Sequence, residues 1–187
     1  MQIDIIKKRF TLIQNRFNIL VEGNLAYKAK SVFFSVPPKI RLLDLSGHEI
    51  CSVQQQNIID EINLPKYNLI FGNDESLIRL NLESFTHYKM HNSKGIIDIY
   101  EQKGRKLGLF LNDNQIGVIE KNKFVKFGAD IYRILINSSE IDKELAIAFT
   151  LAYDNYKYNR GAFLNVDFGN ILIDSEREID PNWRPIN

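Results

Sequence analysis

The segment "KELAIAFTLAYDNYKY", residues 143–158, determines how the chain must fold. It has the composition of a helix, yet between Leu145 and Tyr153 only Thr150 is polar, so apolar side chains surround the predicted helix on all sides. A helix of this kind needs its whole surface buried, either in a membrane or inside a protein. A membrane span requires about 20 apolar residues, and this shorter run has charged residues at both ends. The sequence therefore predicts a helix that is enclosed by the rest of the protein.

The ends of this helix, predicted at about residues 140–158, are marked by polar residues. Ser139 and Asp142 have the spacing of a capping box, and a carboxylate there suits the helix dipole. At the other end, we expect Asp154 to mark the point where the helix emerges into water. We expect the following side chains to contact inward-facing strand residues: Leu145, Ile147, Ala148, Phe149, Leu151 and Ala152.

Before residue 138 the chain has almost no helical periodicity and consists of short segments rich in Ile, Val, Leu, Phe and Tyr, with Gly, Asn and Asp between them. Examples are "RFNILVE", "KIRLLDL", "GIIDIYEQ", "QIGVIEK" and "DIYRILIN". Closing a sheet into a barrel removes its exposed edges, and the interior of a barrel with many strands is wide enough to enclose a helix. We therefore predict a mainly-β fold, a closed antiparallel barrel of about 12 strands that encloses the hydrophobic helix near the C-terminus.

Composition limits the class of protein. The chain has 187 residues, 44% of them apolar, and a net charge of +1, which indicates one globular domain without the positive excess that nonspecific nucleic-acid binding uses. The single Cys51 excludes an internal disulfide, and the first ten residues do not read as a secretory signal. We expect a cytoplasmic protein without a transmembrane segment and without a nucleic-acid partner.

The order of several motifs resembles a known family. "RLLDLSGHEICSV" is followed by "NDNQIGVIEK", and then by "DIYRILIN" leading into "KELAIAFTLAYD". This order resembles the tubby C-terminal-like superfamily, in particular its LURP-one-related and bacterial members, over about Phe10 to Tyr158. The resemblance implies a barrel of about twelve strands around a hydrophobic helix, an architecture that phospholipid scramblases are thought to share. It assigns residues 1–160 to the barrel domain and residues 161–187 to a C-terminal extension.

The extension departs from the pattern of the family. We expect "AFLNVDFGNILI", residues 162–173, to form an extra strand or hairpin, and "PNWRPIN", residues 181–187, to form a surface tail. Trp183 between two prolines suits docking into a groove of a partner protein. The alternative to docking on a partner is that the tail folds back and caps an open end of its own barrel.

The resemblance also implies a ligand, because tubby proteins bind phosphoinositides through basic residues on the barrel surface. The candidate residues for an anionic phospholipid head group form three groups: Lys28 and Lys30 on one strand, Lys103, Arg105 and Lys106 at one turn, and Lys121, Lys123 and Lys126 at another. Residues two apart on a strand point to the same face, so the first pair can bracket a phosphate. If the two turns lie at one end of the barrel, their cations form a rim. The alternative is that these cations are simply solvated surface residues.

Enzyme motifs fail on inspection, so we expect no enzyme, no cofactor and no metal. "HEICS", residues 48–52, lacks the second histidine and the helix of a zinc-binding H-E-x-x-H motif. His87 and His91 would be about 13 Å apart on a strand, too far for one metal ion, and we expect both on the surface. We expect Cys51 to be a small buried residue and Asp44 to stabilise its own hairpin. The sequence thus favours a non-enzymatic barrel that binds anionic lipid at the membrane periphery; the alternative is a protein-interaction or scaffolding module.

Overall fold

The computed structural model describes residues 1–8, 15–32, 35, 38–56, 66–71, 78–82, 86–92, 94–122, 130–158 and 175–186. Within these residues it contains twelve strands and one helix. The strands are β1 (Gln2–Lys8), β2 (Arg16–Val21), β3 (Asn24–Ser31), β4 (Lys39–Leu43), β5 (Glu49–Gln55), β6 (Tyr67–Phe71), β7 (Ile78–Leu82), β8 (His87–Asn92), β9 (Gly95–Gln102), β10 (Lys106–Leu111), β11 (Asn114–Lys121) and β12 (Asp130–Ile136); the helix is α1 (Lys143–Tyr158). The predicted mainly-β class with one apolar helix is confirmed.

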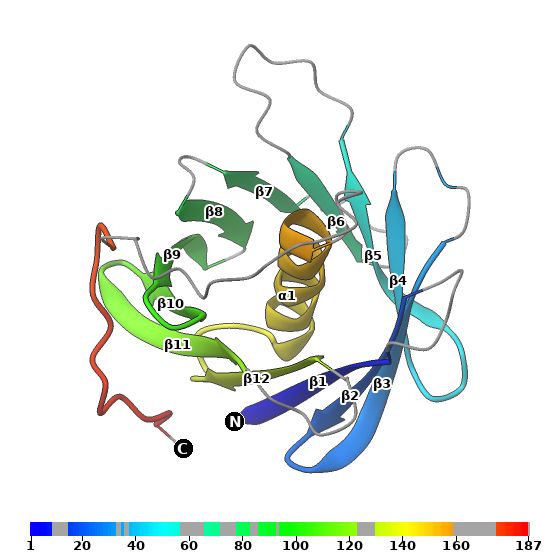
Figure 1. Cartoon of the computed structure of the whole chain (residues 1–187), viewed down its shortest axis with the longest axis horizontal. Coiled ribbons are helices and arrows are strands. Elements are labelled where there is room, and N and C mark those ends of the chain that lie inside the picture. The colour runs from blue at the N-terminus through cyan, green and yellow to red at the C-terminus, as the bar shows by residue number, and fades with distance from the viewer. Residues whose placement is uncertain are drawn as a thin grey trace.

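Strand pairing follows the order of the sequence. Each described strand pairs antiparallel with its sequence neighbours, and β1 pairs with β12 as well as with β2, so the order of the strands closes on itself. Figure 1 shows the strands arranged around α1. This closure satisfies the backbone hydrogen bonds that a sheet edge would leave open. Among the residues that the structure describes, no helix has the length and apolarity required to cross a membrane.

The helix is buried on all sides, as its composition predicts. Its central apolar side chains are at most 2% exposed and belong to one hydrophobic core with the inward-facing strand residues: Leu145, Ile147, Ala148, Phe149, Leu151 and Ala152. Thr150 does not disturb this core, because its hydroxyl donates a hydrogen bond to the Ala146 carbonyl at 2.8 Å. Burying one large apolar side chain contributes about 1.5–3 kcal/mol, so the helix is a major source of stability.

Two expectations about the helix ends are wrong. The helix begins at Lys143, and the carbonyl of Asp142 accepts hydrogen bonds from the Leu145 and Ala146 amides. The hydroxyl of Ser139 instead donates to the Asn137 side chain at 3.0 Å, because Ser139 lies too far before the first turn to cap it. Asp154 is fully buried. The helix continues past it to Tyr158, and the side chains of Lys7 on β1 and Tyr132 on β12 bind the Asp154 carboxylate inside the barrel.

Two strands, β1 and β8, are not predicted by the sequence pattern, because polar residues interrupt their apolar alternation. In β1, Ile3, Ile5 and Lys7 point inward, so one of the three inward positions carries a charge. This strand closes the barrel. The predicted strand or hairpin at residues 162–173 lies outside the described residues.

Beyond the helix, residues 175–186 run along the outside of β9, β10 and β11, at the left of Figure 1. Residues 175–180 thus contact the outside of the barrel, and the predicted tail at 181–187 follows them; the expectation that the tail caps an open end of the barrel stays a prediction. These contacts are made by Gln102 of β9, Asp113 in the turn between β10 and β11, and Gln115 of β11.

Candidate functional site

A group of basic side chains lies on the outer face of the first three strands, β1, β2 and β3. Lys8 of β1 is opposite Arg16 of β2, and Arg16 is opposite Lys30 of β3. Lys28, two residues before Lys30, is opposite Asn18. Directly opposite residues have Cβ atoms about 5 Å apart, so the register brings these charges into one row. We call Lys8, Arg16, Lys28 and Lys30 the cationic face.

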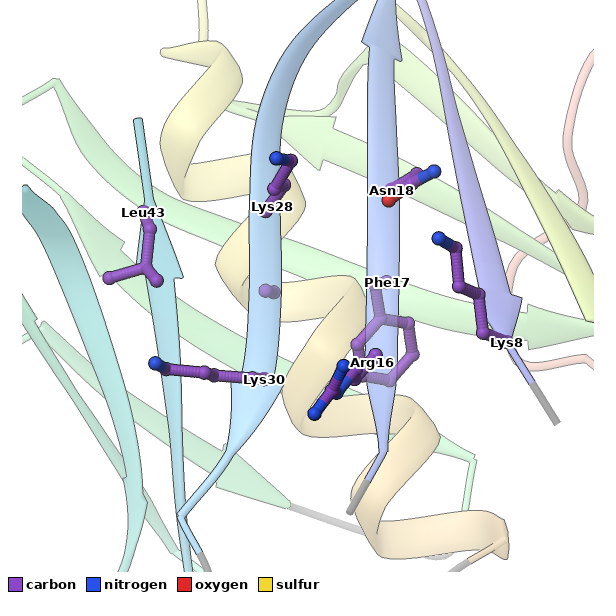
Figure 2. Close-up of a pocket in the computed structure, with 8 residues that line it drawn as sticks. Lys8, Arg16, Phe17, Asn18, Lys28, Lys30 and Leu43 are labelled. Atoms are coloured by element: carbon purple, nitrogen blue, oxygen red, sulfur yellow. The ribbon is translucent and has the colours of Figure 1, made fainter. Parts of the chain in front are cut away.

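The alternation of the strands explains why all four side chains reach solvent. Phe17 and Ala29 are buried in the core, and the neighbouring positions on β2 and β3 therefore point outward. Figure 2 shows the cationic side chains on three adjacent strands, with α1 behind them. Together with Asn18 and Leu43 they line a shallow depression of about 410 Å³. The prediction that Lys28 and Lys30 share one face of a strand agrees with this geometry.

The charges of the cationic face are not compensated by neighbouring carboxylates in the described part of the chain. Arg41 of β4 continues the row, since it lies opposite Lys30, but its guanidinium is 2.9 Å from the Glu49 carboxylate. Like charges that face each other across strands destabilise a sheet. A row of this kind is therefore suited to an anion that bridges it.

The other predicted cations are differently placed. The turn before β10 and the end of β11 do meet, because the Lys121 amide donates to the Arg105 carbonyl at 3.0 Å. Lys106 is paired with Glu120 at 2.6 Å, and the side chain of Lys121 is only 7% exposed, 3.7 Å from Asp130.

The structure thus brings part of the predicted rim together but compensates two of its charges. Lys103 lines a separate depression beside the tail, with Lys106 and Glu178. Lys123 and Lys126 lie outside the described residues. The rim is on strands other than those of Lys28 and Lys30, so the candidates do not form one site.

Two members of the cationic face, Lys8 and Arg16, are not among the residues predicted from the sequence. Each is an isolated basic residue on its own strand, and only the register of β1 with β2 and of β2 with β3 places them beside Lys30. The spacing of residues within one strand contains no such information.

Inside the barrel, two buried carboxylates lie near the C-terminal half of α1. Asp154 accepts hydrogen bonds from Lys7 and Tyr132, and Glu101 accepts them from Tyr88 and Lys157. Burial, and after it the charge of Glu101, raises the pKa of Tyr88 well above its ordinary value. Among the described residues, each carboxylate thus contacts an ammonium group and a phenol, which stabilises its buried charge.

Burial and local hydrogen bonds account for the environments of Cys51 and Asp44, two of the residues considered for enzyme chemistry. Burial raises the pKa of the Cys51 thiol to about 12. Asp44 accepts a hydrogen bond from the His48 amide at 2.8 Å, which lowers the pKa of its carboxyl and confirms its role in the hairpin. His91 is exposed, and His87 is partly exposed on the outer face of β8, where its ring contacts Asp98 at 2.8 Å and stacks on Tyr100. No group of three or more His, Cys, Asp or Glu residues in the described ranges could hold a metal ion.

Comparisons with known proteins agree with the fold. An X-ray structure of an Arabidopsis thaliana protein aligns with a TM-score of 0.56 and 15% identity, over 83% of this chain and 91% of that one. A search of the curated proteins gives no match. The model of the LURP-one-related family matches residues 1–154, so the similarity begins at the first strand and not near Phe10 as expected. The chain belongs to the LURP-one-related family.

Proposed function

We propose that the protein is a non-enzymatic barrel that binds an anionic phospholipid head group through the cationic face. The observation that carries this proposal is the row of Lys8, Arg16 and Lys30 across three adjacent strands, without carboxylate partners in the described residues. Phosphate oxygens accept charge-assisted hydrogen bonds, and an arginine can donate two of them in parallel. Arg16 stands in the middle of the row, flanked by two lysines.

The expected affinity for an anionic membrane determines how sensitive a binding experiment must be. Each basic residue near an anionic membrane surface contributes about 1 kcal/mol, so four of them give about 4 kcal/mol, which corresponds to a dissociation constant of about 1 mM. Salt screens this attraction, with a Debye length of about 8 Å at physiological ionic strength. Binding that persists at physiological salt therefore requires hydrogen bonds to the head group in addition to charge attraction.

The experiment is co-sedimentation of the full chain with phosphatidylcholine vesicles, with and without a phosphoinositide, at low and physiological salt. We expect binding only to the phosphoinositide vesicles, and we expect Lys28→Gln with Lys30→Gln to abolish it without lowering the melting temperature. The matched control is Lys103→Gln with Lys106→Gln, which removes one charge from the turn before β10 and one from the first residue of β10. That variant should bind like the unmodified protein.

Two outcomes would contradict the proposal. If the protein binds neither vesicle at low salt, the lysines are solvated surface residues and the function lies in contacts with other proteins. If only the Lys103 and Lys106 variant loses binding, the head group is bound at the turn and not at the cationic face. Competition by a soluble inositol phosphate would distinguish recognition of the head group from attraction to the membrane surface.

A further inference from the structure

The outer face of β9 and β10 carries two aromatic side chains, Tyr100 and Phe110, that pack against each other. Leu107, Leu109 and Leu111 point into the core, so Phe110 points outward, yet it is only 4% exposed. Its ring packs edge-on against Tyr100, with centroids 5.8 Å apart, and Tyr100 stacks on His87. Something must therefore cover this strip from outside.

The cover is the C-terminal tail, and Arg177 is its central contact. The Arg177 guanidinium lies 4.1 Å from the centroid of the Phe110 ring. Its Nη1 donates to the Asp113 carboxylate at 2.6 Å, and its Nη2 donates to the Asp113 carbonyl. Arg177 therefore uses its planar face and its edge at once, which fixes its position more closely than charge alone would.

A notch in β10 receives the second anchor, Ile179. A Cβ atom at Gly108 would overlap Ile179 Cγ2 and would approach the edge of the Phe110 ring to 2.9 Å. The absence of a side chain at Gly108 is thus what allows the tail to approach the strand. Ile179 fills the space that this glycine leaves.

Polar groups hold the tail at either side of these anchors. The Gln102 amide donates to the Ser175 hydroxyl at 2.7 Å and to the Arg177 carbonyl at 2.6 Å. The Asp180 amide donates to the Gln115 side chain at 2.9 Å. Asp180 then closes a turn by accepting the Asn182 amide, so the contact segment ends there.

We propose that the outer face of β9, β10 and β11 is a peptide-docking groove, defined by Gln102, Gly108, Phe110, Asp113 and Gln115. Residues 175–180 occupy it in cis. A protein segment with the pattern Ser-x-Arg-x-aliphatic-Asp takes the same place in trans when the tail is released. The contacts described above come from one short stretch of chain, residues 175–180, so a separate peptide of this sequence can make them. The groove is on β9, β10 and β11, whereas the cationic face is on β1, β2 and β3, so the two proposals can be tested separately. The tail itself lies beyond residue 154, where the match to the family model ends.

The test must first empty the groove, because a tethered tail has an effective concentration in the millimolar range. The host is the full chain carrying Arg177→Ala and Ile179→Asp, which removes both anchors and leaves the groove intact. Trp183 is the only tryptophan, so its fluorescence anisotropy reports release of the tail. We expect this anisotropy to fall in the host, with an unchanged melting transition of the barrel.

A labelled peptide of residues 175–186 is then titrated into the host. We expect it to bind the host at least tenfold more tightly than the unmodified protein, whose own tail competes. The same peptide with Arg177→Ala and Ile179→Asp should not bind. Adding Gly108→Ala to the host should remove binding of the unmodified peptide, and Asp113→Asn, which leaves the packing of β10 unchanged, should weaken it.

The proposal is overturned if the Trp183 anisotropy stays unchanged in the host, because the two anchors then do not hold the tail. It is also overturned if the unmodified and the substituted peptide bind the host equally. Equal binding of the unmodified peptide to the host and to the unmodified protein would place the peptide at some other surface.

Discussion

Lys7 and Asp154 form a buried ion pair inside the barrel, with Lys7 Nζ 2.7 Å from Asp154 Oδ2. The two side chains are only 10% and 1% exposed. Tyr132 donates to the other carboxylate oxygen at 2.8 Å. The pair joins the first strand to the central helix across 147 residues of sequence. The enclosed helix is thus fixed to the strand that closes the barrel.

Removing Lys7 should be strongly destabilising. Lys7→Met leaves the Asp154 carboxylate buried without its ammonium partner, and breaking such a pair costs about 3–5 kcal/mol. Urea unfolding of the variant at neutral pH gives the change in free energy. The neighbouring Lys8→Met changes an exposed side chain and should cost much less.

A second substitution tests the cause. Adding Asp154→Asn to Lys7→Met removes the unpaired charge and keeps an oxygen that can accept from Tyr132. The double variant should be more stable than Lys7→Met alone. If it is equally unstable or worse, the loss comes from packing around Lys7 and not from the buried carboxylate.

Burial of α1 makes its small residues intolerant of charge. Ala148 is fully buried, and Ala148→Asp places an unpaired carboxylate there, at a cost of several kcal/mol against a total stability of about 5–15 kcal/mol. We expect loss of cooperative thermal unfolding by circular dichroism. Ala148→Ser is the milder control. A variant that melts at the temperature of the unmodified protein would contradict the enclosure of the helix.

Cys51 should be unreactive in the folded protein. Burial raises its pKa to about 12, so at pH 8 the thiolate fraction is on the order of 10⁻⁴, and the thiolate is the reactive form. A disulfide reagent such as DTNB should label the native protein slowly and the urea-unfolded protein at once. Rapid stoichiometric labelling of the native protein at pH 8 would show that Cys51 is accessible.

Glu144 should make stability depend on pH. Burial opposes its charge, but the hydrogen bonds from Tyr27, at 2.6 Å, and from Lys143 prevail, so the folded pKa lies below the ordinary 4.5. A lowered pKa gives stability that is present above pH 4.5 and lost as the pH falls through the folded value. Tyr27→Phe should therefore destabilise the protein at pH 7, and the difference should shrink as the pH falls below 4.5.

Urea unfolding at a series of pH values measures this effect. Glu144→Gln cannot ionise, so it should lack this component of the pH dependence, and Tyr27→Phe should change its stability equally at all pH values. A constant difference between the unmodified protein and Tyr27→Phe would exclude the linkage to Glu144.

The row of like charges on the cationic face should lower stability. Lys30 lies between Arg16 and Arg41, and facing like charges typically cost about 0.2–1 kcal/mol. Lys30→Gln should therefore raise the free energy of unfolding slightly at low salt, and the gain should shrink as salt is added. Lys39→Gln, which removes a partner of Glu49, is the control and should not stabilise. A loss of stability in Lys30→Gln would show that Lys30 makes a favourable contact.

Local patterns were sufficient to predict the class of fold. The apolar surface of residues 143–158 on all sides already requires an enclosed helix, and the short alternating segments before it require strands around that helix. Polar interruptions hid β1, because a lysine at an inward position reads as a break when its partner Asp154 is not known. The same pairing explains why Asp154 was expected in water.

The sequence by itself thus determined that strands enclose an apolar helix, because periodicity and burial depend on residues close together in the chain. Only the tertiary structure decided which charges lie together. Arg16 meets Lys8 and Lys30 through the register of three strands, Lys7 meets Asp154 inside the barrel, and Arg177 reaches Phe110 from the tail. These contacts join residues far apart in sequence, and their geometry exists only once the barrel has closed.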